Sequence, residues 1–122
     1  ASRVLDLPQI PKVRQEKKPK IIFKIHIDSY IYSEHLTIKT VKGNVKYEII
    51  GQIREINDEF FGISEIYDQN FYIVLENIED LIGKEILLSY QGCLKNILCY
   101  PKITKKILIT KSKNNLNSFK FL

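Results

Sequence analysis

The sequence predicts a single all-β domain: an antiparallel β-sandwich or barrel-like fold of about seven strands, with one short helix and an extended N-terminal arm. Three observations predict this fold. Apolar and polar residues alternate over most of the chain, turn signals recur about every 8–12 residues, and β-branched and aromatic residues are abundant. Of the 122 residues, 21 are Ile and 7 are Tyr. These side chains suit a pleated, half-buried surface better than a helix.

Residues 1–20 are expected to form an extended arm, because Pro8, Pro11 and Pro19 disfavour a helix there. Spaced aliphatic residues make this segment too apolar for a simple linker: Val4, Leu5, Leu7, Ile10 and Val13. Two interpretations stay open. The arm docks in a groove or on a sheet edge of another molecule, or it packs along its own domain.

Residues 21–110 are expected to form the β domain. Its inward-facing positions follow from the period of two in the apolar residues. They include Ile21, Phe23, Ile25, Ile27, Leu36, Ile38, Val45, Tyr47, Ile49, Ile53, Phe71, Ile73, Leu75, Ile107 and Ile109. Gly51 interrupts the pattern and predicts a bulge or a close backbone approach.

One short helix is predicted over residues 78–82, with Asn77 as its N-cap and Gly83 just past its end. Residues 111–122 read as a basic C-terminal tail. Its last residues, Phe119, Phe121 and Leu122, alternate with polar ones, so this segment is expected to pair with another strand.

The charge is unevenly distributed along the chain. Counted from the sequence, residues 1–24 carry a net charge of +5, residues 25–99 carry −6 and residues 100–122 carry +6. An acidic body would repel phosphate, which argues against nucleic-acid binding. Basic ends and an acidic body instead favour contacts between the ends of one copy and the body of another.

Targeting and membrane signals are missing from the sequence pattern. Residues 1–20 lack the apolar core of a signal peptide, and no apolar run is long enough for a membrane span. The expectation is synthesis in the cytoplasm without export.

The two histidines, His26 and His35, lack the spacing of metal ligands and are expected on the surface. Adjacent carboxylates, such as Asp58 and Glu59, point to opposite faces of a strand and make no acid–base pair. Phosphate-binding glycine motifs are absent. The sequence therefore predicts no catalytic residues, no metal, no cofactor and no enzyme activity.

The two cysteines, Cys93 and Cys99, allow three interpretations. On one unbroken strand they would lie about 20 Å apart and could not bond to each other. A turn at Lys95 and Asn96 would bring them together as a disulfide. A crosslink between copies is the third possibility. Reduced structural thiols are the default expectation.

Three segments form a recognisable set: the proline-marked lead-in at residues 7–13, the I-K-T-x-x-G turn with the strand that follows it at residues 36–53, and the apolar strand at residues 71–75. Together they resemble the SPOCS domain of bacterial spore coat and spore envelope proteins. The resemblance covers roughly residues 7–110. It implies a structural role at the spore surface, in contact with coat proteins or further copies, without catalytic residues.

The combined expectation is a subunit of the spore coat, exosporium or a spore appendage that self-assembles into a homopolymer through its terminal arm. Two alternatives remain. The first is a monomeric adaptor that binds another coat morphogenetic protein. The second is a nucleic-acid-binding β-barrel with stacking surfaces at Tyr30, Tyr32, Tyr47 and Tyr72.

Overall fold

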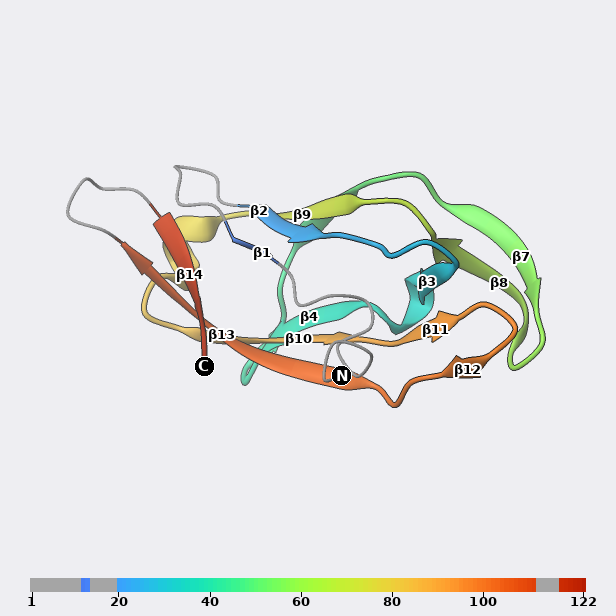
Figure 1. Ribbon diagram of the computed structural model, residues 1–122. Helices are drawn as coiled ribbons and strands as arrows, with labels where there is room; N and C mark the ends of the chain where they lie inside the picture. Colours follow the sequence, from blue (N-terminus) through green and yellow to red (C-terminus); the bar gives the residue numbers. More distant parts are fainter. Residues whose placement is uncertain (1–11, 14–19, 112–116) are drawn as a thin grey trace.

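The computed structural model describes residues 12–13, 20–111 and 117–122, and this part of the chain is built almost entirely of short antiparallel strands (Figure 1). The first sheet has the order β1 (Lys12–Val13), β2 (Lys20–Phe23), β9 (Phe71–Leu75), β6 (Tyr47–Ile50). The second has the order β14 (Asn117–Phe121), β13 (Ile103–Lys111), β10 (Glu85–Tyr90), β4 (Thr37–Thr40), β5 (Gly43–Asn44). The third has the order β12 (Leu98–Cys99), β11 (Gly92–Leu94), β3 (Ser29–Tyr32), β8 (Gly62–Tyr67), β7 (Arg54–Asp58).

The first two sheets form the layers of a sandwich, with the main apolar core between them (Figure 1). Ile21 and Ile73 from the first sheet, and Ile86, Leu88 and Ile107 from the second, have no exposed surface. Full burial of one such side chain contributes roughly 1.5–3 kcal/mol to folding. The expected alternation of β2, β9 and β13 is confirmed, and the open sheets exclude a closed barrel.

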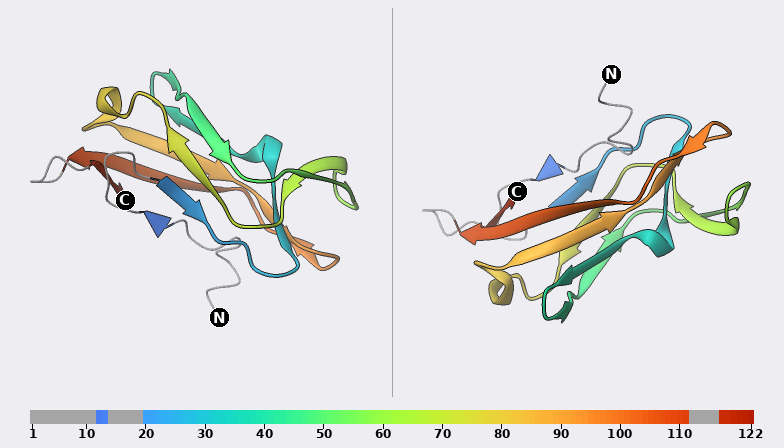
Figure 2. Two further views of the ribbon diagram at one scale, coloured as in Figure 1. Left: turned by 90° about the horizontal axis from the view of Figure 1, so that it is seen from above. Right: turned by 90° about the horizontal axis from the view of Figure 1, so that it is seen from below.

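The third sheet closes one end of the sandwich, and its two outer hairpins extend from this end in both views of Figure 2. A second, smaller core lies here, formed by Tyr30, Tyr32, Ile66 and Cys93. The chain enters this sheet directly from the second one. Tyr90, at the end of β10, pairs with Ile103 on β13 of the second sheet. Two residues later, Gly92 pairs with Ile31 on β3 of the third sheet.

Three details of the expected fold are wrong. In the described part of the chain, fourteen short strands replace the roughly seven expected, because the chain changes sheets at bends that break the longer patterns. The predicted helix is one 3₁₀ turn, η3 (Ile78–Leu81), and Asn77 precedes it in a left-handed conformation without capping it. Ile27 is 88% exposed, since β2 ends at Phe23 and the alternation beyond it no longer belongs to a strand.

Close packing explains why a glycine is needed at position 51. A Cβ atom at this position would lie 2.5 Å from Cβ of Phe71, well inside contact distance. The sequence-based expectation of a close backbone approach is therefore confirmed. It lets the chain between β6 and β7 cross Phe71, whose ring stacks on both Phe23 and Tyr67.

The C-terminal residues pair within the same chain. β14 lies along β13, with Phe119 opposite Ile109 and Phe121 opposite Ile107. Phe119 is buried in the main core of the sandwich. The expected pairing of this segment is therefore intramolecular. Within the arm, Val13 lies on β1 opposite Ile21, while Val4, Leu5, Leu7 and Ile10 fall outside the described residues.

Candidate functional site: a cross-strand disulfide

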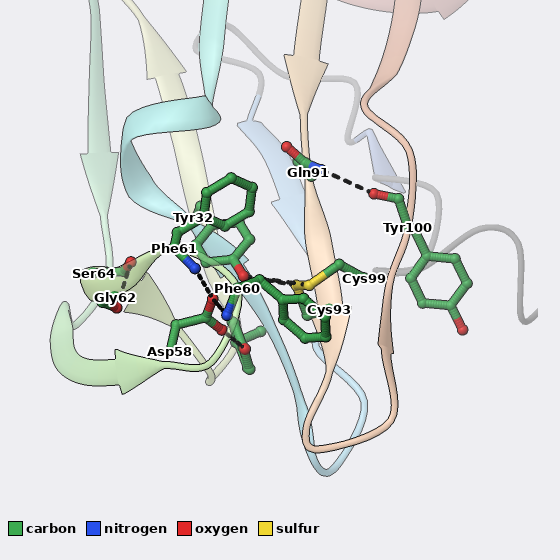
Figure 3. Close-up of a disulfide and its surroundings, with 11 residues drawn as sticks. Tyr32, Asp58, Phe60, Phe61, Gly62, Ser64, Gln91, Cys93, Cys99 and Tyr100 are labelled. Atoms are coloured by element: carbon green, nitrogen blue, oxygen red, sulfur yellow. Dashed lines mark hydrogen bonds between the residues drawn. A yellow bond between two sulfur atoms is a disulfide. The ribbon is translucent and has the colours of Figure 1, made fainter.

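Cys93 and Cys99 form a disulfide across the β11–β12 hairpin (Figure 3). They lie directly opposite each other in the strand register, with their Cα atoms 4.0 Å apart. Asn96 makes the hairpin possible because it adopts a left-handed conformation, with φ of 60°, that Asn tolerates better than most residues. Of the three interpretations left open by the sequence, the turn that joins the two cysteines is therefore the correct one, and the default of reduced thiols is wrong.

The two cysteines differ in their exposure to solvent. Cys93 is completely buried in the small core, whereas Cys99 is only partly buried at its edge. Nucleophilic attack on a disulfide requires access to one of its sulfurs. The geometry therefore favours attack at Cys99, with Cys93 as the sulfur that leaves.

The hydroxyl of Tyr32 lies beside both sulfurs, 2.9 Å from Sγ of Cys93 and 3.3 Å from Sγ of Cys99. Neither sulfur of a disulfide carries a proton, so only the hydroxyl can donate. The hydroxyl also interacts with Asp58 and Tyr30. Burial first, and these two partners next, raise the pKa of Tyr32 well above its ordinary value. At neutral pH this side chain therefore acts as a hydrogen-bond donor and is not a source of phenolate.

Asp58 supports the two tyrosines from the end of β7. The hydroxyl of Tyr30 donates to Oδ1 of Asp58, and the backbone N–H groups of Phe60 and Phe61 donate to Oδ2 at 2.9 and 2.8 Å. Burial by itself would raise the pKa of Asp58, but the hydrogen bonds from Tyr30, Tyr32 and the two amides outweigh it and lower the pKa. Burial, followed by the Asp58 hydrogen bond, raises the pKa of Tyr30 to about 12. A buried carboxylate thus faces two neutral tyrosines next to the disulfide.

The β7–β8 turn (residues 59–61) packs against Tyr32. The ring of Phe61 meets the ring of Tyr32 edge-on at 5.0 Å, and His35 lies 5.4 Å from both rings. Because two amides of this turn bind Asp58, the turn and the tyrosines are held as one unit. A cavity of about 130 Å³ between this hairpin and the Cys93–Cys99 hairpin leads to Tyr30 and Asp58.

Exposed apolar side chains lie on the two hairpins at the end of the molecule that carries the disulfide. We define the apolar rim as Phe60, Phe61, Ile63, Ile97 and Leu98, which come from the two hairpins at this end of the molecule and are 38–74% exposed. Apolar residues gathered around one polar site are typical of a surface that binds another protein. A larger open groove of about 770 Å³, between β4–β5 and η3, contains no cysteine.

Several sequence-based interpretations of individual residues need correction. Tyr30 and Tyr32 are buried and cannot stack nucleic-acid bases, while Tyr47 and Tyr72 are partly buried in the first sheet, away from the disulfide. His26 is exposed, as expected, but His35 packs into the aromatic cluster. Within the described ranges, no group of three His, Cys, Asp or Glu side chains could hold a metal. In the same ranges, no helix is long and apolar enough to cross a membrane.

The comparison with known proteins decides the family. Residues 5–111 match the sequence model of the family described as "Thiol:disulfide interchange protein DsbD, N-terminal". The chain belongs to the DsbD N-terminal domain family. It is 30% identical over 94 residues to the thiol:disulfide interchange protein DsbD of Colwellia psychrerythraea, and 29% identical over 104 residues to that of Vibrio vulnificus. These alignments cover 75% and 83% of this chain, but 15% and 17% of the two relatives.

Solved DsbD structures share the fold. The reduced DsbD N-terminal domain of Neisseria meningitidis superposes with a TM-score of 0.72 and 20% identity, and the match covers 99% of this chain and 98% of that one. A complex between the DsbD N-terminal and PilB N-terminal domains of the same species matches with a TM-score of 0.59 and 22% identity, over 80% of this chain and 78% of that one.

The family overturns the functional expectations drawn from the sequence. The resemblance to the SPOCS domain is wrong, and with it the spore-coat subunit, the homopolymer, the coat-protein partners and the spore-surface location. The segments quoted for that resemblance carry only the apolar alternation that β-sandwiches of many families share. The expectation of no enzyme activity is wrong as well, because the family is one of thiol–disulfide interchange and the cysteine pair is present.

Sequence reasoning missed the site because its parts are distant in the chain. Tyr32, Asp58 and Cys93 meet only after four strands, β11, β3, β8 and β7, have paired. One local signal was available. Two cysteines that flank a short segment containing Asn are compatible with a hairpin, in which the two residues at equal distance from the turn face each other.

Proposed function

We propose that this chain is a redox domain that exchanges its Cys93–Cys99 disulfide with a dithiol of a partner protein. The observation that carries the proposal is the asymmetry of the disulfide, with one partly exposed cysteine, one buried cysteine and a tyrosine hydroxyl in contact with both sulfurs. A structural disulfide has no need for such access. The family of thiol–disulfide interchange proteins supports the same chemistry.

The exchange proceeds through two displacements. A thiolate of the partner attacks Sγ of Cys99, so a mixed disulfide forms while the bond to Cys93 breaks and its electron pair goes to Sγ of Cys93. The second thiolate of the partner then attacks its own sulfur in the mixed disulfide and releases Cys99. The partner dithiol loses two electrons and becomes a disulfide. Cys93 and Cys99 become reduced, with two protons taken from the partner thiols through solvent.

Tyr32 assists the leaving sulfur. As Cys93 develops negative charge in a buried position, it needs a hydrogen-bond donor, because an isolated buried charge is unfavourable. The Tyr32 hydroxyl is already 2.9 Å away. Its single hydrogen can be directed to the new thiolate, while the hydroxyl of Tyr30 continues to donate to the Asp58 carboxylate. A donor that stays protonated at neutral pH suits this role.

The partner is proposed to dock on the apolar rim, since these exposed side chains lie on the hairpins at the same end of the molecule as Cys99. A thioredoxin-like domain, which presents a reactive cysteine at its surface, fits this requirement. The solved complex of a DsbD N-terminal domain with a PilB N-terminal domain supports a protein partner for this fold. Because disulfides persist in oxidising compartments, we place the domain outside the cytoplasm.

Equilibration with a purified thioredoxin tests the proposal. Oxidised chain is mixed with reduced thioredoxin, and free thiols on each protein are alkylated and counted by mass spectrometry over time. The expected result is a gain of two thiols on this chain for each thioredoxin that becomes oxidised, within seconds to minutes. If the disulfide stays intact in the folded chain and is reduced only in denaturant, its role is structural and the proposal is wrong.

A further inference from the structure

Gln91 lies between β10 and β11, and its hydrogen bonds connect the segments that carry the site. Its backbone carbonyl accepts the N–H of Tyr32 at 3.1 Å. Its side-chain Nε2 donates to the carbonyl of Tyr100, also at 3.1 Å, as Figure 3 shows. One residue thus holds the tyrosine that contacts the sulfurs and the residue that follows Cys99.

The Tyr100 carbonyl lies outside the strand ladders. Cys99 is the last residue of β12, and the next strand begins only at Ile103. Pro101 follows Tyr100 and has no N–H to offer a neighbouring strand. Tyr100 is only 5% exposed. Its carbonyl therefore depends on a side-chain donor, and Gln91 is the donor.

The strand that carries Cys99 is otherwise held by few contacts. β12 has two residues, and only Cys99 and Leu98 pair with β11. Ile97 at the turn is 65% exposed and Leu98 is 38% exposed, so little apolar burial fixes this strand. Once the disulfide is reduced, the short ladder with β11 and the Tyr32 hydroxyl, 3.3 Å from Sγ of Cys99, still hold this strand. Just beyond it, the N–H of Tyr100 donates to the Gly92 carbonyl at 3.0 Å, and the Tyr100 carbonyl accepts from Gln91.

We propose that Gln91 is a positioning residue for the redox reaction: its side chain holds Cys99 opposite Cys93 and thereby favours closure of the disulfide. This inference rests on the proposed redox function. Two constraints on the same strand reinforce each other, and the coupling is reciprocal: if the disulfide makes the Gln91–Tyr100 bond easier to form, that bond stabilises the disulfide by the same factor. Gln91 itself transfers no electrons or protons.

A redox titration of the full chain tests this inference. Wild type, Gln91→Ala and Gln91→Glu are equilibrated with mixtures of reduced and oxidised dithiothreitol, and the fraction of protein disulfide is measured by thiol alkylation. Both variants are expected to shift the equilibrium towards the dithiol by about 3- to 10-fold, the range of one net hydrogen bond. Gln91→Glu matches the shape of Gln, but its carboxylate cannot donate to the Tyr100 carbonyl.

The matched control is Tyr47→Phe, which removes a side-chain hydrogen bond to the backbone carbonyl of Leu36, away from the disulfide. It is expected to leave the redox equilibrium unchanged, even if it lowers the melting temperature. Unshifted equilibria in both Gln91 variants, with a wild-type chain that titrates normally, would overturn the positioning role alone. A folded wild-type chain that never equilibrates with dithiothreitol would overturn the redox function and this inference together.

Discussion

At the scale of single residues, the disulfide is distinguished by its polar neighbours. Tyr32 contacts both sulfurs, and Asp58 accepts hydrogen bonds from the Tyr30 hydroxyl and two backbone amides. Burial first, and these contacts second, raise the pKa of both tyrosines, whereas the hydrogen bonds outweigh burial and lower the pKa of Asp58. The consequence is a fixed pattern of charge, in which Asp58 is ionised and both hydroxyls keep their protons at neutral pH.

The carboxylate of Asp58 should make the stability of the fold depend on pH. A carboxyl group whose pKa is lowered by folding stabilises the native state above its ordinary pKa, and this contribution is lost as the pH falls below it. Asp58→Asn should therefore lower the free energy of unfolding at pH 7 by about 1–3 kcal/mol, the cost of weakening hydrogen bonds to a charged group. The difference from wild type should shrink as the pH falls below 3.8, the ordinary value for this group.

Urea unfolding of both proteins between pH 2 and pH 7 measures this difference. Asp68→Asn is the matched control, since Asp68 lies outside the disulfide site and pairs with Arg54 at the surface. A stability difference for Asp58→Asn that stays constant over the whole pH range would contradict the assignment of a stabilising carboxylate at this position.

At the scale of secondary-structure elements, close crossings between chain segments hold the two sandwich layers and the third sheet together. The crossing of Gly51 over Phe71 is one of them, and an added Cβ at Gly51 would lie 2.5 Å from Cβ of Phe71. Phe71 in turn stacks on Phe23 from β2 and on Tyr67 from β8. A disturbance at Gly51 would therefore reach both the main core and the sheet that carries the disulfide.

Gly51→Ala should destabilise the fold because a methyl group has no room at this crossing. The expected loss is about 1–3 kcal/mol, as for other side chains forced into a packed interior. Thermal or urea unfolding measures it, with Gln52→Ala at the exposed neighbouring position as the control. Equal stabilities of the two variants would show that the segment shifts away from Phe71 without cost.

Local sequence patterns predicted the elements better than their arrangement. The alternation around Ile21, Phe23, Ile107 and Ile109 identified inward positions correctly, because a period of two depends only on the strand itself. The number of strands could not be predicted in the same way. Bends such as that at Gln91, where one run of residues serves two sheets, are set by pairing partners far away in the sequence.

At the scale of the whole molecule, the sandwich positions a redox site at one end. The third sheet brings Tyr32, Asp58 and the two cysteines together from four separate strands, and the hairpins add the apolar rim. The sequence left the cysteine pairing open, because it depends on a turn at Asn96 that local patterns allow but do not require. The tyrosines and Asp58 could not be assigned to the site, because nothing within the strand of each one indicates its neighbours.

The central claim is that Cys99 receives the attack and Cys93 leaves, and trapping of the mixed disulfide tests it most directly. Single variants Cys93→Ser and Cys99→Ser are each incubated, folded, with a thioredoxin activated as a mixed disulfide with thionitrobenzoate, and the products are measured by mass spectrometry. The account predicts that Cys93→Ser, which keeps the partly exposed Cys99, forms the covalent complex rapidly. It predicts that Cys99→Ser, which keeps the buried Cys93, forms it at least about 10-fold more slowly, because access governs the reaction. Equal rates, or faster reaction of Cys99→Ser, would contradict the account.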